Sequence, residues 1–419
     1  MNPSVIRLQQ CTGIFRPDPI THAPEYITPA APINGYRGYL CPGDNDAACA
    51  RGRQVAHAVR AGHIADFERS PDYCTRHGES DADQMVHVST FDIIRGMIYM
   101  TYYANTQTAA EDHHHQEARL AFCPADHPEQ LTVLTLQKVG DMLDGRRIDA
   151  LYDTIFLYKG GNELYLMWTA SADGMYYRFY CIYDIEAHTL GPIRPNRFRV
   201  GAAEADFSIR GITAALTANG LPHKTMFTDI GIMQKLTSRE EAGETWYYTG
   251  AYSGFFNCII KSRDLITWEY VAAPDFINLS LWENAVYVRG SRCYYFVRQT
   301  DCQQGFLTYY DLDAHTWAAP CLIRDSQSRS DFFVYRDTLY LVHAPLNREG
   351  FGVVRVNEQA LEQSEPVFVA DLGESCFYPF VRVWEDCAYI SYTVDRKHIR
   401  LAQFDLRRAL GSTESEAQE

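Results

Sequence analysis

One hairpin unit recurs six times along the chain, and this repeat constrains the fold more than any other feature. Each copy is an apolar strand, a short polar turn and an aromatic strand, as in "TFDIIRGMIYMTYYA" and "LWENAVYVRGSRCYYFVR". The copies begin near residues 90, 151, 226, 281, 330 and 377. Steps of about 50 residues are typical of four-stranded propeller blades. We therefore predict an all-β fold, a five- or six-bladed β-propeller over residues 86–410, with a pair of β-sandwiches as the alternative.

The first 85 residues lack this repeat and form a predicted N-terminal extension. Apolar residues at three- and four-residue steps predict a helix over about 46–68, with Asp46 as its cap. The segment "SVIRLQQ" near the N-terminus could supply the outer strand that closes the last blade. Residues 411–419 are polar and predict a flexible tail.

Composition excludes several classes of function. The net charge is −15 and no Lys/Arg-rich run is present, which argues against nucleic acid and anionic membranes as partners. No apolar run approaches the length of a membrane span, and the N-terminus does not read as a signal peptide. The 12 cysteines are scattered without a C-x-x-C pair, as expected for thiols of a cytoplasmic protein. A homo-oligomer is left open.

Propeller geometry predicts where the chemistry should lie. The innermost strand of every blade starts on one face beside the central axis, so strand starts that are distant in sequence converge there. Carboxylates crowded in such a cleft separate into acid and base roles. Four strand starts carry the predicted catalytic residues: Asp153, Asp229, Glu283 and Asp331.

The loops between the second and third strands open on the same face and add polar and aromatic residues. Together with other residues near the strand starts, they supply the predicted substrate contacts. These are His87, His113, His115, Arg147, Tyr152, Trp282, Arg298, His343 and Tyr378.

Three consecutive histidines lie in the loop "EDHHHQ", which leads into "EARLAF", the predicted third strand of the first blade. Adjacent residues of an extended segment point to opposite sides, so His113 and His115 would face the pocket and His114 would be dispensable. A metal site is disfavoured, because tetrahedral closure needs further ligands and the chain shows no Cys/His ligand spacing. We predict neither metal nor cofactor.

Three turns resemble the Asp-box turn of sialidases and the S-x-D-L-x-x-W turn of invertase- and arabinanase-like propellers. They are "YDIEAHTLGP", "YDLDAHTWAAP" and "KSRDLITWEY". The resemblance to these propeller glycosidases covers about three quarters of the chain. It implies that Glu283, in "LWENAVYV", stands at the place of the general acid in the invertase/arabinanase-like group. It also implies that Asp331 leads an Asp-started blade.

The sequence also departs from these families. No counterpart of the invertase "N-D-P-N-G" box is present, and the sialidase arginine triad is not identifiable. The segment "FRPDP" is only a faint echo of the sialidase "FRIP" box.

We predict a glycoside hydrolase that acts on short oligosaccharides through paired carboxylates. Glu283 is the predicted general acid and Asp153 the base, while Asp229 or Asp331 orients the sugar or tunes Glu283.

Two other functions remain open. A uronide-cleaving lyase would use His and Tyr as base and acid. The residues available to such a lyase are His87, His113, His114, His115, Arg147, Tyr152 and Tyr378. A propeller that binds carbohydrate without catalysis is the third hypothesis, because fold does not imply activity.

Overall fold

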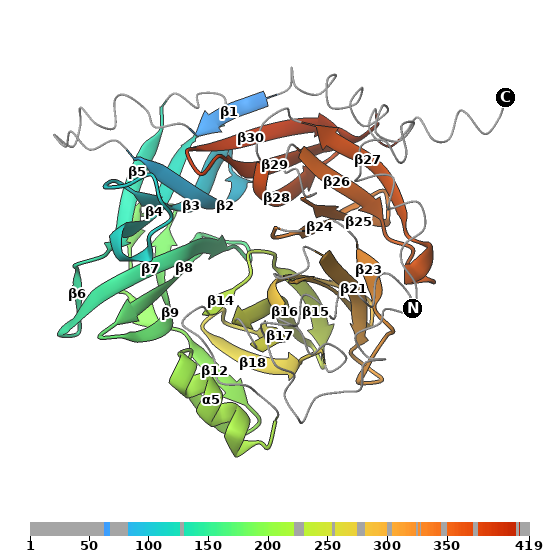
Figure 1. The fold of residues 1–419 in the computed structure, drawn as a ribbon, viewed down its shortest axis with the longest axis horizontal. Coiled ribbons are helices and arrows are strands. Elements are labelled where there is room, and N and C mark those ends of the chain that lie inside the picture. Colours follow the sequence, from blue (N-terminus) through green and yellow to red (C-terminus); the bar gives the residue numbers. More distant parts are fainter. Residues whose placement is uncertain are drawn as a thin grey trace.

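The structure is a computed structural model, and strands are the main element of what it describes. It describes residues 63–67, 83–125, 130–221, 230–253, 256–274, 281–299, 304–323, 326, 328–344, 350–371, 376–407 and 410. Within these ranges six sheets, antiparallel except for one parallel pair of strands in the third, are arranged in a propeller-like ring (Figure 1). No helix in the described ranges is long and apolar enough to cross a membrane.

The first three sheets follow one another along the chain. The first contains β2 (Met85–Ile94), β3 (Met97–Asn105), β4 (Gln116–Pro124) and β5 (Thr132–Lys138). The second contains β6 (Met142–Leu143), β7 (Arg146–Leu157), β8 (Glu163–Ala172), β9 (Met175–Asp184), β10 (Thr189–Leu190) and β11 (Arg194–Pro195). The third contains β12 (Arg197–Val200), β13 (Ala203–Asp206), β14 (Ile230–Ile232), β15 (Thr237–Glu241), β16 (Glu244–Ser253), β17 (Phe256–Ser262) and β18 (Thr267–Ala272). Helix α5 (Ile209–Ala218) lies on the outside of the third sheet (Figure 1).

The last three sheets complete the ring. The fourth contains β19 (Leu281–Arg289), β20 (Arg292–Gln299), β21 (Gln304–Asp311), β22 (Thr316–Trp317) and β23 (Cys321–Ile323). The fifth contains β24 (Asp331–Tyr335), β25 (Thr338–His343), β26 (Gly350–Arg355) and β27 (Glu365–Asp371). The sixth contains β28 (Cys376–Trp384), β29 (Cys387–Val394), β30 (His398–Asp405) and β1 (His63–Phe67).

The predicted all-β, propeller-like architecture is confirmed, whereas the count of five or six blades stays a prediction. Strand β4 is the third strand of the first sheet, as the segment "EARLAF" predicts. Apolar side chains seal the first sheet against the sixth: Phe91 of β2 meets the ring of Phe380 of β28 edge-on at 5.8 Å. The two ends of the repeat therefore pack together and close the ring.

The N-terminal extension differs from its prediction where the structure describes it. Residues His63–Phe67 form the strand β1, which pairs antiparallel with β30. The predicted helix over about 46–68 therefore does not extend through these five residues, because they hydrogen-bond to the edge of the sixth sheet. The outer strand of the sixth sheet is therefore supplied by His63–Phe67, within the segment predicted as helix. The segment "SVIRLQQ", residues 46–62 and the tail over 411–419 lie outside the described residues.

The three Asp-box-like turns share one side-chain cap, although the left-handed residue is His188 and His315 in two of them and Leu265 in the third. Asp184, Asp264 and Asp311 each follow or end a strand, and one carboxylate oxygen of each accepts two main-chain N–H groups of the next residues, at 2.8–3.0 Å. Such side-chain capping of a turn is the usual role of Asp between strands. These turns stabilise hairpins at the edges of the sheets and lie outside the site described below.

Four inner strands are interrupted by a bulge at the same place. The pairing register shifts by one residue between His87 and Thr90 in β2, and likewise in β7, β19 and β28. In three of these bulges the first extra residue has a left-handed backbone: Val88, Asp153 and Tyr378 each have φ of +55°. A bulge bends the strand and redirects the side chain, and left-handed backbone is strained for such residues. The repeated bulge thus decides which side chains turn toward the centre of the ring.

Candidate active site

Seven polar side chains meet at the bulged ends of the inner strands. We call them the central cluster: Asp153, Arg178, Tyr252, Glu283, Arg298, Arg329 and Tyr378. They come from strands of four sheets and from residues 328–330 before β24. Residues distant in sequence therefore converge near the axis, as propeller geometry predicts.

Asp153 is the best-connected carboxylate of the central cluster. Its side chain is 2% exposed and accepts hydrogen bonds from Arg178 Nη1 at 3.1 Å and from the Tyr252 hydroxyl at 3.3 Å. Arg329 Nη2 donates to its other oxygen. Arg178 also donates to the main-chain oxygen of Asp153, at 2.7 Å. With both oxygens occupied, Asp153 holds two arginines in place.

Glu283 forms a different arrangement with a phenol. The Tyr378 hydroxyl donates to Glu283 Oε1 at 2.5 Å, and Arg298 Nη1 donates to Oε2 at 2.7 Å. Glu283 is 1% exposed, whereas Tyr378 is partly exposed. The pair therefore couples a buried carboxylate acceptor to the hydroxyl of a partly exposed tyrosine.

Arg329 joins the two halves of the central cluster. Its Nε lies 3.8 Å from Glu283 Oε1, while its Nη2 binds Asp153 and the Tyr252 hydroxyl. Its guanidinium also stands 4.9 Å from the centroid of the Tyr378 ring. Three arginines and two carboxylates leave the central cluster with one net positive charge, in a chain whose net charge is −15.

Burial and charge set the proton affinities of the central cluster. Burial, together with the Glu283 carboxylate, raises the pKa of Tyr378, although Arg298 and Arg329 oppose this change. Burial opposes the charged form of Arg298, but the Glu283 carboxylate outweighs it and raises the pKa of Arg298 above its ordinary value. Both groups therefore stay protonated in the resting site, and Tyr378 needs a base in order to react.

His87 lies directly behind Tyr378. The two rings stack with centroids 4.5 Å apart and an interplanar angle of 19°. His87 is 0% exposed, so it supports Tyr378 rather than lining the open surface where a substrate contact was predicted. Its Nδ1 lies 3.1 Å from Thr393 Oγ1, and its ring meets Tyr103 edge-on at 5.7 Å.

The histidine run folds as a short 3-10 turn, η2 (His113–His115), rather than as the extended loop we expected. His113 stacks on Tyr152 with centroids 4.5 Å apart, which places it beside the bulge that carries Asp153. His115 Nδ1 pairs with Asp112 Oδ2 at 2.8 Å, within its own loop. His114 Nδ1 lies 2.7 Å from the main-chain oxygen of Asp149. His113 and His114 therefore both contact β7, the strand that carries Asp153, whereas His115 pairs within its own loop.

Asp331 belongs to a second group of buried charges. Its oxygens accept the main-chain N–H of Phe332 at 2.9 Å and of Val381 at 2.7 Å, and Lys235 Nζ lies at 2.9 Å. Lys235 also donates to the main-chain oxygen of Val381 at 2.7 Å. We call Asp331 and Lys235 the lower pair. Both contact Val381, which lies three residues beyond Tyr378 on β28. Its contacts do not include Glu283 or Asp153, the residues that Asp331 was expected to assist.

Two other predicted contacts, His343 and Arg147, are not members of the central cluster. His343 is fully buried on β25, and burial lowers its pKa to about 3, so it is a neutral packing residue. Arg147 is exposed near the start of β7. The side chain of Trp282 and all of Asp229 lie outside the described residues, so their predicted roles stay predictions.

Sequence reasoning missed three members of the central cluster: Arg178, Tyr252 and Arg329. Arg178 is a fully buried charge within the otherwise aromatic strand "MYYRFYCIYD", and this contrast was the available signal. Tyr252 resembles the many other tyrosines of the inner strands. Arg329 precedes a strand within the polar segment "SQSRSD", which gives no periodic signal.

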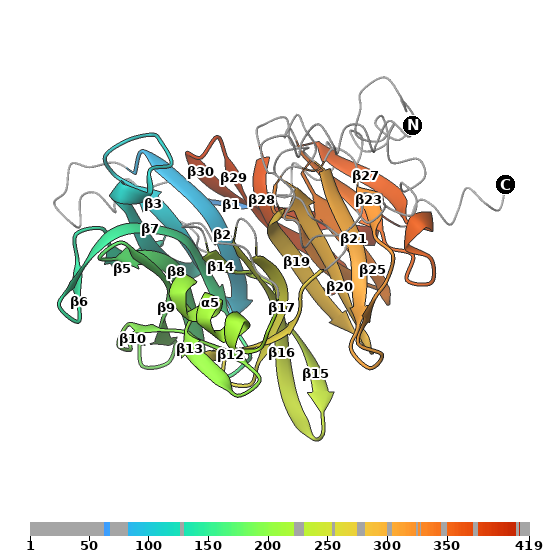
Figure 2. The same ribbon diagram turned by 60° about the horizontal axis from the view of Figure 1, so that its bottom comes forward.

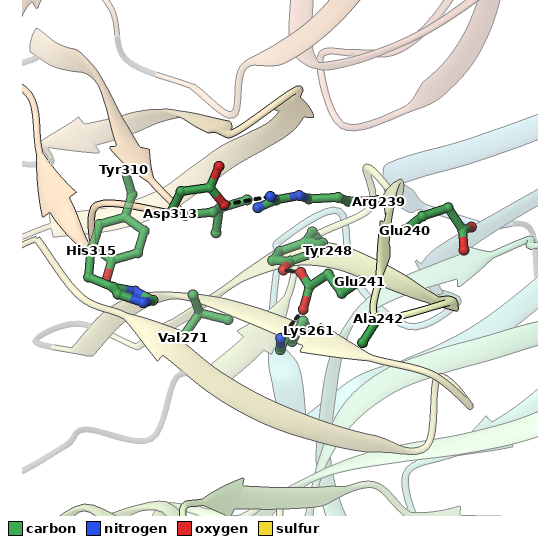
Figure 3. Close-up of a pocket in the computed structure, with 11 residues that line it drawn as sticks. Arg239, Glu240, Glu241, Ala242, Tyr248, Lys261, Val271, Tyr310, Asp313 and His315 are labelled. Carbon is green, nitrogen blue, oxygen red and sulfur yellow. Dashed lines mark hydrogen bonds and ion pairs between the residues drawn. The ribbon is translucent and has the colours of Figure 1, made fainter.

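A surface hollow of about 400 Å³ lies between the third and fourth sheets. Figure 3 shows its polar lining, in which Arg239 binds Asp313 at 2.6 Å and Lys261 binds Glu241 at 2.6 Å. The hollow is at the β15–β16 turn, the end of β16 opposite to Tyr252. In Figure 2 this hairpin projects beyond the neighbouring strands. The hollow is therefore separate from the central cluster.

No protein-family model and no curated protein matches the sequence. Solved structures do match its fold. Trypanosoma rangeli sialidase in complex with 2,3-difluorosialic acid (covalent intermediate) has a TM-score of 0.51 and 12% identity, covering 85% of this chain and 58% of that one. A leech intramolecular trans-sialidase complexed with 2,7-anhydro-Neu5Ac has a TM-score of 0.54 and 9% identity, covering 83% and 72%. A Hadza microbial sialidase has a TM-score of 0.57 and 9% identity, covering 82% and 68%.

These comparisons establish the class of fold. The chain spans 58% of the length of the T. rangeli protein. The predicted resemblance to sialidase-like propellers is confirmed at the level of fold, which is what identities of 9–12% support.

Proposed function

We propose that the protein is a glycoside hydrolase that cleaves an anionic sugar, with Tyr378 as nucleophile and Glu283 as its base. The proposal takes the six sheets as six blades around one axis, with the central cluster on that axis. The observation that carries it is the hydrogen bond from the Tyr378 hydroxyl to Glu283 Oε1, at 2.5 Å. A weak nucleophile needs an adjacent general base, and a tyrosine nucleophile is the known exception of sialidases among glycoside hydrolases.

The charge of the central cluster supports an anionic substrate. Its charge is positive, whereas the net charge of the chain is negative. An anionic sugar would therefore be attracted to the central cluster and repelled by the rest of the surface. Arg298, whose side chain is 15% exposed, is the described arginine best placed to reach a carboxylate. Guanidinium groups bind carboxylates through paired hydrogen bonds. Two of the structurally similar proteins are complexed with sialic acid derivatives, which makes sialosides the first substrates to test.

The roles differ from those expected from sequence. Glu283 accepts hydrogen bonds from two donors, Tyr378 and Arg298, which favours a base over the predicted general acid. Asp153 is enclosed by Arg178 and Arg329, which favours positioning those arginines over the predicted base. Asp331 is paired with Lys235 and accepts two main-chain N–H groups, which favours a structural role.

The proposed reaction has two steps. In the first, the Tyr378 oxygen bonds to the anomeric carbon as the glycosidic bond breaks. The phenol proton passes to Glu283, and the leaving oxygen takes a proton from a general acid. Asp229, which the sequence led us to expect as a residue that orients the sugar or tunes Glu283, is our candidate for that acid. In the second step water attacks the anomeric carbon and gives a proton to the conjugate base of that acid. The bond to Tyr378 breaks, Glu283 returns its proton to the Tyr378 oxygen, and the sugar is released.

A uronide lyase is the second candidate, because a phenol beside an arginine could also serve an elimination. The fully buried position of His87 argues against it as the base that removes a substrate proton. The products separate the two reactions: a hydrolase releases a reducing sugar, and a lyase forms an unsaturated uronide that absorbs in the ultraviolet.

The test compares the wild-type protein with Tyr378→Phe and Glu283→Gln on a fluorogenic sialoside and a fluorogenic uronide. Phenylalanine keeps the ring that stacks on His87 and removes only the hydroxyl. We expect kcat to fall by about 10⁴-fold or more in Tyr378→Phe and by about 10²–10⁴-fold in Glu283→Gln. Circular dichroism and thermal unfolding would verify that each variant is folded.

The matched control is Tyr252→Phe, which removes the phenol that binds Asp153 and leaves Glu283 untouched. We expect this control to retain activity within about tenfold of wild type. Turnover by Tyr378→Phe at wild-type rates would contradict the proposal. Saturable sugar binding without any turnover by the wild-type protein would favour the carbohydrate-binding hypothesis instead.

A further inference from the structure

His87 is a buried histidine placed against the reactive ring. It stacks on Tyr378 at 4.5 Å, and in the bulged register of β2 it lies one residue before the left-handed Val88. Its imidazole is shielded from solvent on all sides. A buried imidazole can carry a positive charge only if a negative charge lies near enough to stabilise its protonated form.

Glu111 supplies such a counter-charge. Its Oε1 accepts the Tyr103 hydroxyl at 2.5 Å, and its Oε2 accepts Arg396 Nε at 2.8 Å. Burial opposes ionisation of Glu111, but the charge of His87 and the hydrogen bonds from Tyr103 and Arg396 outweigh it and hold the pKa of Glu111 at about 2. Interaction between two charges is reciprocal, so an ionised Glu111 also stabilises protonated His87.

Resting on the proposed function, we infer that His87 is a positioning residue that, protonated against Glu111, places a positive charge behind the ring of Tyr378. When Tyr378 attacks, its proton leaves and negative charge develops on the phenol oxygen. A cation stacked on the ring stabilises that charge, both as the bond to the sugar forms and as the phenolate departs in the second step.

Some of the groups around His87 favour its protonated form and others oppose it. Glu111 favours its protonated form, and Glu283, bonded to Tyr378, adds a more distant negative charge. Burial and the cations Arg329 and Arg396 oppose protonation. Tyr103 and Tyr378 stay neutral, since burial raises the pKa of each. The interaction with Glu111, which reaches His87 across Tyr103, is therefore the one that a substitution should remove.

The test records the imidazole signals of His87 and the ring signals of Tyr378 by NMR between about pH 5 and 8, in the full chain labelled at histidine and tyrosine. His87→Gln assigns the histidine signal, and Tyr378→Phe assigns the tyrosine signal. Glu111→Gln removes the counter-charge. His343→Gln is the matched control, because His343 is equally buried but stays neutral.

We expect the Tyr378 signal to change with the same midpoint as His87. In Glu111→Gln both midpoints should fall by at least about one pH unit, a tenfold loss of proton affinity, and in His343→Gln both should stay. The kcat of the wild-type protein should decline as pH rises through that midpoint, and His87→Gln should lose this dependence. A His87 that stays neutral throughout, or is unaffected by Glu111→Gln, would overturn the inference even if the enzyme is active. A protein that shows the shared midpoint but hydrolyses no glycoside would overturn the proposed function alone.

Discussion

The central cluster and the lower pair both bury a carboxylate beside a cation, yet they use its oxygens differently. Asp331 of the lower pair is held by two main-chain N–H groups and by Lys235. Among the described residues, Glu283 of the central cluster is held by the side chains of Tyr378 and Arg298, with Arg329 Nε 3.8 Å from Oε1. Main-chain donors are fixed by the sheets that carry them, whereas a phenol can give up its proton. The comparison suggests that Asp331 joins β24 to β28 and that Glu283 takes part in chemistry.

Burial decides how much the lower pair contributes to the stability of the fold. Burial raises the pKa of Asp331 and lowers that of Lys235, although each partner opposes the change in the other. Taking two charges out of water can cost more than their attraction returns. The lower pair is therefore expected to specify how the fifth and sixth sheets meet, more than to add net stability.

The largest effect that distinguishes the two sites is on stability. Asp331→Ala leaves Lys235 buried without its counter-charge and two main-chain donors without their acceptor, so we expect the free energy of unfolding to fall by about 3–5 kcal/mol. The double variant Asp331→Leu/Lys235→Met should recover most of this loss, because it replaces the pair by apolar groups. Urea unfolding measures both. A fully stable Asp331→Ala that has lost activity would instead return Asp331 to the predicted catalytic set.

A smaller effect is on how stability depends on pH, which differs between Glu111 and Asp331. The pKa of Glu111 is held at about 2, below its ordinary value, so its contribution to stability is present above about pH 4.3 and is lost as pH falls toward 2. Asp331 acts in the opposite sense, because its raised pKa makes protonation favour the folded state.

We expect Glu111→Gln to cost roughly 1 kcal/mol at neutral pH and almost nothing at about pH 2. This is less than the full shift of pKa implies, because the side chain of Glu111 is 27% exposed. The measurement is the urea midpoint of both proteins across this pH range. An equal loss at both pH values would show that Glu111 acts through packing and not through its charge.

The fold was readable from the sequence because its repeat is local. The hairpin unit, the Asp-box-like turns and the strand "EARLAF" each depend on residues close together in the chain. Glu283 and Tyr378 were recognised for the same reason, since both mark the start of a repeated strand. The helix expected over about 46–68 failed at His63–Phe67, because pairing with the edge of β30 overrides a local helical pattern.

The partners in the site were not readable, because they depend on geometry between sheets. A one-residue bulge hardly alters the alternation of a strand, yet it turns Asp153 and Tyr378 toward the centre. Asp153 and Asp331 look alike in sequence. Arg178 and Arg329 enclose the first, while Lys235 and main-chain amides hold the second.

The most direct test of the proposed role of Tyr378 is to trap the sugar on the protein. The protein would be incubated with 2,3-difluorosialic acid, digested and analysed by mass spectrometry, with Tyr378→Phe and Tyr252→Phe beside it. We expect one sugar adduct on the peptide that contains Tyr378, in the wild-type protein and in Tyr252→Phe, and none in Tyr378→Phe. An adduct on Glu283 or Asp153, or steady hydrolysis of sialosides with no adduct on Tyr378, would contradict this role.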